Sequence, residues 1–239
     1  MCGRYVLAAP DELTERFQLR QVPLGLMSRW NAAPGQSLPV IVEEPGGGRV
    51  VRLMHWGLIP RWSTREGERI APINARVEGI GDKAMFRNLV TRRRCLVPAN
   101  GFYEWQAAGR GGKQPFYIHQ PDDALFAFAG VWDDTFPDQA TPGEPVPAGS
   151  FTIVTTDANQ MMSPLHHRMP VILCRDAEGA WLDPAVTDAS AATAVIRPLP
   201  EEALVYYPVS TAVNNVRHEG PELVERWTPP IEPQQASLF

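Results

Sequence analysis

Cysteine is scarce in this chain: three are present among 239 residues, at Cys2, Cys95 and Cys174. An odd number of widely spaced cysteines gives no disulfide framework, and without CxxC or HxxxH spacing we expect no metal site. Long apolar runs are also missing. No stretch is long enough to span a bilayer, and no charged start followed by an apolar run indicates a signal peptide. These absences predict a cytoplasmic protein without a membrane segment.

Several standard motifs are absent as well. The sequence has no P-loop, no glycine-rich dinucleotide turn and no G-x-S-x-G elbow, so no cofactor is expected. The formal net charge of −5 argues against a generally basic coat for nucleic acid. It does not exclude a local basic cleft, because the position of each Lys and Arg decides where an anion binds.

The chain instead contains many short apolar runs bounded by proline or glycine. It has 24 prolines, and the runs between them are rich in Val, Ile, Phe, Tyr and Trp, which is typical of strands. Helical periodicity is brief, and short helices are expected at 10–19, 83–90, 192–199 and 221–227. The pattern predicts a β-dominated α+β fold with a single domain over 1–227. Residues 228–239 are expected to form a disordered tail.

A cysteine at position 2 is the most unusual feature of the sequence. Removal of Met1 would leave Cys2 with a free amine and a thiol on neighbouring carbons, a pair that no internal cysteine offers. A free cysteine is also one of the commonest core residues, so Cys2 alone is equally well explained as the start of a buried strand.

Three further stretches concentrate polar groups among apolar residues. "PINARVE" places Asn74, Arg76 and Glu78 on one face if it forms a strand. "NGFYEWQ" places Glu104 between two aromatic residues, and "SPLHHRMPVIL" has two adjacent histidines before a strand. Each also has a simpler structural explanation. Asn74 could be a turn residue, Glu104 could lie on the solvent-exposed face of a strand, and the two histidines could lie in a solvated loop.

Taken together, these segments have a specific likeness. The motifs "MCGRY", "WNAAPGQ", "HWGLIPRW", "NARVE", "MFRN", "RRRCLVPANGFYEWQ", "FAGVW", "FTIVTT", "HHRMPVIL" and "VNNVR" follow one another over most of the chain. In this order they resemble the SOS-response-associated peptidase (SRAP) family, the abasic-site sensors of bacteria and eukaryotes. One departure is Gly79, which stands where the family usually has threonine after the glutamate of "NARVE".

The resemblance implies an SRAP-type domain whose strands form a barrel-like core with short flanking helices. It also implies a covalent bond between the protein and an abasic site in single-stranded DNA. Cys2 would be the nucleophile, and Asn74, Glu104 and His166 match the family's other active-site positions. Aromatic neighbours suit Glu104 to acid–base work, because loss of water favours the protonated carboxyl group. His167 occupies the variable position of the histidine motif.

Within this interpretation, two sets of residues would contact DNA. Guanidinium groups pair well with phosphate oxygens, and aromatic rings stack on bases. The expected phosphate ligands are Arg4, Arg76, Arg87 and Arg168, and the expected stacking residues are Trp56, Trp62 and Trp105. Structural ion pairs remain the alternative for one or two of the arginines, and a place in the core remains the alternative for Trp56.

Two other functions stay open from the sequence. One is an N-terminal-nucleophile glutaminase, which would use the same cysteine against an amide. The other is a module that binds single-stranded DNA without covalent chemistry. The peptidase label of the family implies removal of the chain's own Met1, and cleavage of other proteins stays open. The last residues, "QASLF", resemble a peptide that docks on the bacterial DNA sliding clamp, with Gln235, Leu238 and Phe239 as the contacts. A DNA-bound protein of this kind would be associated with the nucleoid.

Overall fold

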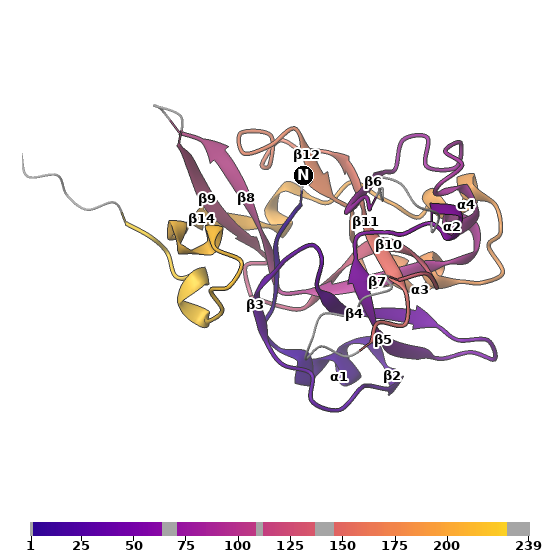
Figure 1. The fold of residues 1–239 in the computed structure, drawn as a ribbon. Coiled ribbons are helices and arrows are strands. Elements are labelled where there is room, and N and C mark those ends of the chain that lie inside the picture. Colours follow the sequence, from indigo (N-terminus) through magenta and orange to yellow (C-terminus); the bar gives the residue numbers. More distant parts are fainter. Residues whose placement is uncertain (1, 64–70, 109–111, 137–145, 229–239) are drawn as a thin grey trace, which may run out of the picture.

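The computed structural model describes residues 2–63, 71–108, 112–136 and 146–228, in which β-strands dominate (Figure 1). The strands are β1 (Tyr5–Leu7), β2 (Leu19–Gln21), β3 (Arg29–Ala32), β4 (Ser37–Glu43), β5 (Arg49–Trp56), β6 (Asn74–Arg76), β7 (Arg94–Ala99), β8 (Gly101–Ala107), β9 (Lys113–His119), β10 (Phe126–Asp133), β11 (Ser150–Asp157), β12 (Arg168–Pro170), β13 (Ile172–Leu173) and β14 (Val205–Pro208). The α-helices are α1 (Leu13–Phe17), α2 (Arg87–Arg92), α3 (Arg175–Leu182) and α4 (Ala189–Thr193). The predicted β-dominated α+β class is confirmed.

The larger sheet curves round on itself. Its strands follow the order β12-β11-β10-β7-β4-β5-β2, and a further parallel pairing joins β11 to β5. The strands from β11 through β10, β7 and β4 to β5 therefore form a closed ring, which is the barrel-like core expected from the sequence. Leu96, Val97 and Phe128 have no exposed surface there, so the continuous apolar runs of β7 and β10 reflect burial of both faces.

A second, five-stranded sheet has the order β14-β9-β8-β1-β3. The chain passes from the larger sheet to this one at Asn100, between the end of β7 and the start of β8. Oδ1 of Asn100 accepts a hydrogen bond from the Ala8 amide at 2.8 Å, and its Nδ2 donates to the Asp123 carbonyl. The next residue must be glycine, because a Cβ on Gly101 would lie 2.4 Å from the Tyr117 ring.

Short helices surround the sheets, and their positions differ in part from the sequence expectation. The helix expected at 10–19 is confirmed as a 3-10 turn at Pro10–Glu12 followed by α1. The helix expected at 192–199 was placed too late: α4 ends at Thr193, and its N-cap is Asp188, which accepts from the Ala191 amide. The expected helix at 221–227 reduces to a 3-10 turn at Pro221–Val224. Helix α3 was missed, since Gly179 weakens its helical signal.

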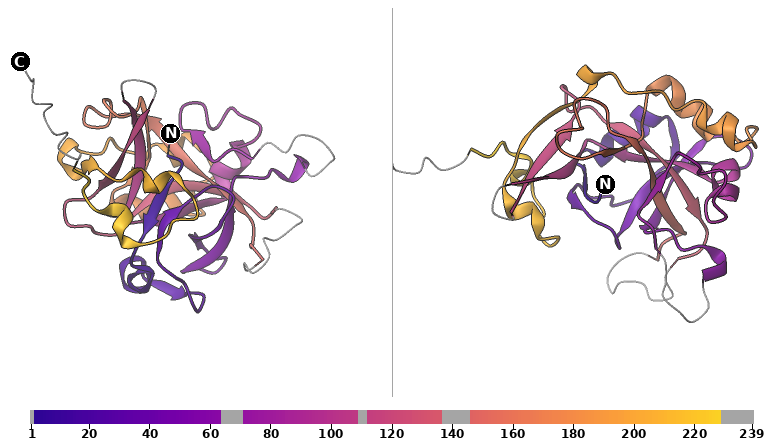
Figure 2. Two further views of the ribbon diagram at one scale, coloured as in Figure 1. Left: turned by 60° about the vertical axis from the view of Figure 1, so that its left-hand side comes forward. Right: turned by 90° about the horizontal axis from the view of Figure 1, so that it is seen from above.

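The helices lie at two sides of the molecule. Figures 1 and 2 show α2, α3 and α4 on one side of the larger sheet, with the C-terminal segment beside β14 and β9 at the opposite side. That segment is attached through Asn31, which is fully buried: its Nδ2 lies within 3.2 Å of the carbonyl oxygens of Val213, Asn215 and His218. Among the described residues, none of the helices has the length and apolar character needed to cross a membrane.

Candidate active site

Cys2 lies immediately before β1, at the junction of the two sheets. The register pairs Tyr5 with Phe102, so β8 fixes the path of the chain just after the cysteine. The side chain has no exposed surface, and Sγ lies 3.9 Å from the Arg4 carbonyl oxygen. Burial raises the pKa of the Cys2 thiol, and the negative charge of Glu104 raises it further. The thiol is therefore protonated at neutral pH.

Asn74 holds the backbone of the cysteine. It begins β6, which pairs in parallel with β11, and its Nδ2 donates a 2.9 Å hydrogen bond to the Cys2 carbonyl oxygen. Along β6, Ala75 is buried and Arg76 is exposed, so Asn74 and Arg76 share a face as the alternation predicts. Glu78 lies beyond the end of the strand.

Glu104 reaches the same site from the five-stranded sheet. It lies on β8 opposite Phe116 of β9, and only 3 % of its surface is exposed. Its charge acts on both the Cys2 thiol and the His166 imidazole, so the carboxylate lies near both. Such a carboxylate is suited to moving protons to and from a reacting group at Cys2.

His166 comes from the turn that leads into β12. The backbone amide of Arg168 donates to His166 Nδ1 at 2.9 Å, so the neutral ring carries its proton on Nε2. Burial is the main cause of the lowered pKa of His166, which keeps the ring uncharged. The turn is held to β8 by Gln106, whose Nε2 donates to the Pro164 carbonyl oxygen. The ring therefore offers an Nε2–H donor on a fixed backbone.

The four expected active-site residues thus converge from four parts of the chain. Asn74 contacts Cys2 directly, and Glu104 is electrostatically coupled to Cys2 and His166. The site combines a thiol, a neutral amide donor, a carboxylate and a neutral imidazole. No group of His, Cys, Asp and Glu side chains within the described ranges could hold a metal ion. The arrangement can therefore combine nucleophilic attack with proton transfer by its own side chains.

The expected phosphate ligands fall into different settings. Arg76 and Arg87 are exposed, as a phosphate ligand requires. Arg4 is half-buried: its Nη1 donates at 2.9 Å to both Asn31 Oδ1 and the Val213 carbonyl oxygen. Its guanidinium also lies over the Trp105 ring, 6.0 Å from the centroid. The structure thus gives Arg4 a clear role in holding the C-terminal segment.

Arg168 does not match its expected role. Its side chain is 5 % exposed and forms a two-point ion pair with Glu78, at 3.0 and 2.7 Å. The same guanidinium contacts Asp157 at 2.6 Å and donates to the Thr155 carbonyl oxygen. Both Nη groups of Arg168 are directed at these acceptors and its Nε is buried, so the side chain offers a phosphate no accessible donor, and the expectation that it binds DNA is wrong for this structure. It is a structural ion pair that joins β12 to β11 and to the segment after β6.

The three expected stacking tryptophans differ in their exposure to solvent. Trp56 has no exposed surface; its Nε1 donates to the Ile73 carbonyl oxygen, and its ring packs against Tyr5 and Phe151. The expectation that Trp56 stacks on a base is therefore wrong, because the core encloses it completely. Trp62 is 61 % exposed, and Trp105 is half-buried with Nε1 bonded to Asn214 Oδ1. These two rings keep surface that a base could contact.

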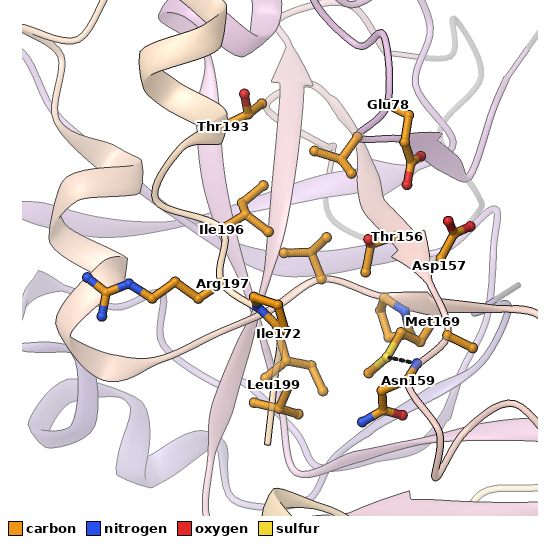
Figure 3. Close-up of a pocket in the computed structure, with 15 residues that line it drawn as sticks. Glu78, Thr156, Asp157, Asn159, Met169, Ile172, Thr193, Ile196, Arg197 and Leu199 are labelled. Carbon is orange, nitrogen blue, oxygen red and sulfur yellow. Dashed lines mark hydrogen bonds between the residues drawn. The ribbon is translucent and has the colours of Figure 1, made fainter. Parts of the chain in front are cut away.

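A cavity of about 490 Å³ lies beside the Arg168 ion pair but apart from this site (Figure 3). It is lined by Glu78, Asp157, Met169, Ile196 and eleven further residues that include none of the four active-site side chains. Glu78 and Asp157 place carboxylates at its rim, and these would repel a phosphate. The cavity is therefore not where a DNA strand would approach Cys2.

Two residues near the site were not assigned roles from the sequence. Asn31 lies in "WNAAPGQ", and its buried amide organises three backbone carbonyls of the C-terminal segment. A lone asparagine before alanines resembles a turn residue, so only the motif itself could have indicated it. His167 stacks on His166, with ring centroids 4.3 Å apart and planes 25° apart. The adjacent pair of histidines was the available signal.

The fold and the site define a β-dominated protein in which a buried cysteine at position 2 lies with an amide, a carboxylate and an imidazole. A family model described as SOS response associated peptidase (SRAP) matches residues 1–216, and the chain belongs to this family. It is 36 % identical over 228 residues to the abasic site processing protein YoqW of Bacillus subtilis, covering 94 % of this chain and 99 % of the relative. The abasic site processing protein HMCES of Gallus gallus is 34 % identical over 223 residues, covering 81 % and 64 %.

A solved structure agrees with this assignment. The crystal structure of a protein from Bacteroides thetaiotaomicron superposes with a TM-score of 0.79 at 27 % identity, covering 95 % of this chain and all of that one. The arrangement of two sheets described above is therefore the fold of an experimentally determined relative.

Proposed function

We propose that this protein processes abasic sites in single-stranded DNA by forming a covalent bond to the lesion through Cys2, after removal of Met1. The observation that carries the proposal is the convergence of Asn74, Glu104 and His166 on a cysteine at position 2. The names of the Bacillus and chicken relatives, abasic site processing proteins, point to the same substrate.

The chemistry follows from the two nucleophiles of an N-terminal cysteine. An abasic sugar opens to an aldehyde at C1′. The free Cys2 amine attacks this carbon, and loss of one water gives an imine. Sγ then forms a bond to the same carbon while the thiol proton passes to the nitrogen. The product is a five-membered thiazolidine ring of N, Cα, Cβ, Sγ and C1′.

The neighbouring side chains serve this sequence of proton transfers. Glu104 accepts a proton from the Cys2 ammonium group and donates it to the sugar oxygen as the ring opens, and it later accepts the thiol proton and passes it to the nitrogen. Because the thiol is protonated at neutral pH, the second bond needs such an acceptor. The Nε2–H of His166 binds the opened sugar's hydroxyl or its phosphate. Asn74 fixes the Cys2 backbone, so both nucleophiles start from one orientation.

DNA would reach the site across the exposed basic and aromatic residues. In this proposal Arg76 and Arg87 contact the phosphates and Trp62 and Trp105 stack on flanking bases, with Arg4 close to the strand at Trp105. The aldehyde gives the specificity, so no base sequence is read. The protein would therefore act wherever single-stranded DNA carries an abasic site, on the nucleoid in the cytoplasm.

A denaturing gel tests the proposal. Protein is incubated with a labelled single-stranded oligonucleotide carrying one abasic site, with an intact oligonucleotide as control. We expect a slow-migrating species with the abasic oligonucleotide only, and none with Cys2→Ala. Intact mass of the purified protein should show loss of Met1. A non-covalent complex alone, glutamine hydrolysis without an adduct, or retention of Met1 would each refute the proposal.

A second partner is proposed for the C-terminal residues. "QASLF" would dock on the DNA sliding clamp, with Leu238 and Phe239 in an apolar pocket and Gln235 at its rim. These residues, with all of 229–239, lie outside the described part of the chain. A peptide that orders on binding has modest affinity, in the micromolar range.

A further inference from the structure

The two adjacent histidines of the active-site turn form a stacked pair, and only one of them has a place in the proposed chemistry. The His166 and His167 rings lie 4.3 Å apart at 25°, which is close to parallel. His166 is half-buried and His167 is exposed. The stack covers one face of the His166 ring, while Nδ1 is occupied by the Arg168 amide at 2.9 Å. Nε2 is then the ring nitrogen left to donate a hydrogen bond to a ligand.

The backbone that carries the pair is firmly held. The His167 carbonyl oxygen accepts from the Ala158 amide at 3.1 Å, and the His166 amide donates to the Met162 carbonyl oxygen at 3.0 Å. The Glu201 carboxylate accepts from two amides of the same turn, those of Gln160 and Met161. Because both backbones are fixed, the two rings have little freedom except rotation about their own side-chain bonds. The stacking restrains that rotation for His166.

We propose that His167 is a positioning residue for the covalent reaction: it holds the His166 imidazole by stacking, in its neutral Nε2–H form. This inference rests on the proposed function. A flip of the His166 ring about its Cβ–Cγ bond would put Cδ2 where Nδ1 lies and lose the hydrogen bond from the Arg168 amide. A second proton on Nδ1 would replace that hydrogen bond by one to the Arg168 carbonyl oxygen, which lies 3.2 Å from Nδ1.

The charges around His166 support the inference. Burial lowers the pKa of His166, Glu104 opposes this, and the positive charges of the chain's N-terminus and of His167 add to the lowering. The guanidinium of the neighbouring Arg168 is paired with Glu78 and Asp157. His167 is thus the partner that both covers the ring and disfavours a second proton on it.

Four full-length variants test the proposal. His167→Phe keeps a flat ring without charge, His167→Leu keeps bulk without a flat ring, and His166→Ala removes the donor. His218→Leu removes an exposed histidine elsewhere and serves as the control. The initial rate of adduct formation is measured from pH 5 to 9 with the abasic oligonucleotide. The tautomer of His166 is read separately by two-bond 1H–15N NMR without DNA.

We expect His167→Leu to slow adduct formation by roughly three- to tenfold, the scale of an aromatic pair. His167→Phe should retain at least half of the wild-type rate. In both, the fall of the rate on the acid side should begin at higher pH, because the charge that opposed protonation of His166 is gone. NMR should show Nε2–H in the wild type and in His167→Phe, and a mixture in His167→Leu.

Other outcomes overturn the inference. Wild-type rate, pH profile and tautomer in His167→Leu would show that the stack has no role. Weaker binding to intact DNA with a smaller salt slope, at unchanged tautomer, would make His167 a phosphate ligand instead. If His166→Ala forms the adduct as fast as the wild type, the role of His166 in the proposed function fails, while the tautomer measurement still decides whether His167 positions the ring.

Discussion

At the scale of single residues, Cys2 joins two properties that oppose each other. It is enclosed completely, and its thiol holds a proton at neutral pH, yet the proposed reaction needs both its amine and its sulfur. The Glu104 carboxylate resolves this opposition, because it raises the pKa of the thiol when charged and can also accept the thiol proton. The reactive form is thus made only while a substrate is being attacked.

This arrangement predicts that two Cys2 variants lose the stable adduct. Cys2→Ser keeps the amine but loses the sulfur, so it should form only a reversible imine that borohydride traps. Cys2→Ala should behave the same way and give no stable adduct without reductant. The measurement is adduct yield on denaturing gels with and without borohydride. A stable adduct from Cys2→Ala without reductant would contradict the thiazolidine.

Glu104→Gln should slow adduct formation by about 100- to 10,000-fold, the usual contribution of a general acid–base group. The amide is nearly the same size but cannot carry the protons. Binding to an intact single strand should change little, because Glu104 is buried on the inner side of β8. Rates are compared by quenched time courses and binding by fluorescence anisotropy. Equal rates in the two proteins would remove Glu104 from the mechanism.

The roles of Asn74, Glu104 and His166 remain predictions; the structure shows Asn74 bonded to Cys2 and Glu104 near Cys2 and His166. Sequence motifs were sufficient to group these residues. They were insufficient for Trp56 and Arg168, because burial and ion-pair partners depend on distant segments. Glu78 and Asp157 are 90 and 11 residues from Arg168 in the chain. No local pattern indicates that these carboxylates, and not phosphates, surround the guanidinium.

At the scale of elements, the Arg168 ion pair connects β12 to β11 and to the residues after β6. The two carboxylates are partly exposed, with side-chain exposures of 49 % for Glu78 and 83 % for Asp157, whereas the guanidinium is covered. The same strand continues back to His166 through the Arg168 amide. The ion pair therefore supports the edge of the sheet from which the active-site turn departs.

Arg168 and Arg76 should accordingly respond in opposite ways. Arg168→Met should lower the free energy of unfolding by about 1–3 kcal/mol, the scale of hydrogen bonds to a charged group, with an unchanged salt slope for DNA binding. Arg76→Ala should leave stability within about 0.5 kcal/mol and lower the salt slope on a single strand by roughly 0.7. Urea unfolding and salt titrations measure these quantities. A reduced salt slope for DNA binding by Arg168→Met would show instead that Arg168 contacts a phosphate.

The strands were predictable from the sequence and several helix bounds were not, for a physical reason. Strands such as β7 and β10 are buried on both faces, so their apolar runs are unmistakable. Helices α2 and α4 have six and five residues, too few for a 3.6-residue period to be recognised. Caps such as Asp188 decide their ends, and several other residues in the chain could serve equally well as caps.

At the scale of the whole molecule, the core contains several buried groups that must keep their protons. Burial raises the pKa of the Cys2 and Cys95 thiols above 9.0 and those of the Tyr5, Tyr103 and Tyr117 hydroxyls above 10.0. The folded chain holds these protons and the unfolded chain releases them. The stability that they contribute is therefore complete below about pH 8.5 and lost as the pH rises.

We expect the free energy of unfolding to fall steeply above pH 9. Each group adds a slope of up to about 1.4 kcal/mol per pH unit once the unfolded chain has ionised. Urea midpoints measured from pH 7 to 11 test this. Cys95→Ala should have a lower free energy of unfolding than the wild type at pH 7. Between pH 8 and 10, however, its free energy of unfolding should fall by less than that of the wild type. A flat profile up to pH 11 would show that the unfolded and folded chains ionise alike.

The clamp proposal also concerns the molecule as a whole. A version ending at Gln234 should keep the unfolding midpoint and the adduct rate of the full chain, and lose binding to the clamp of the same bacterium. Leu238→Ala with Phe239→Ala in the full chain is the matched control for chain length. Equal clamp binding by all three proteins, or by none, would refute the docking peptide and leave the Cys2 chemistry unaffected.

The contacts of Arg4 have a consequence for how the protein is made. Arg4 is among the first residues to leave the ribosome, and its acceptor, the Val213 carbonyl, is added 209 residues later. At bacterial rates of synthesis that interval is about 10 to 40 seconds. In the first part of this time a nascent chain has Cys2 but lacks β8, and until its end the chain lacks the segment that holds Arg4. The proposed removal of Met1 would therefore take place before the candidate site is complete around Cys2.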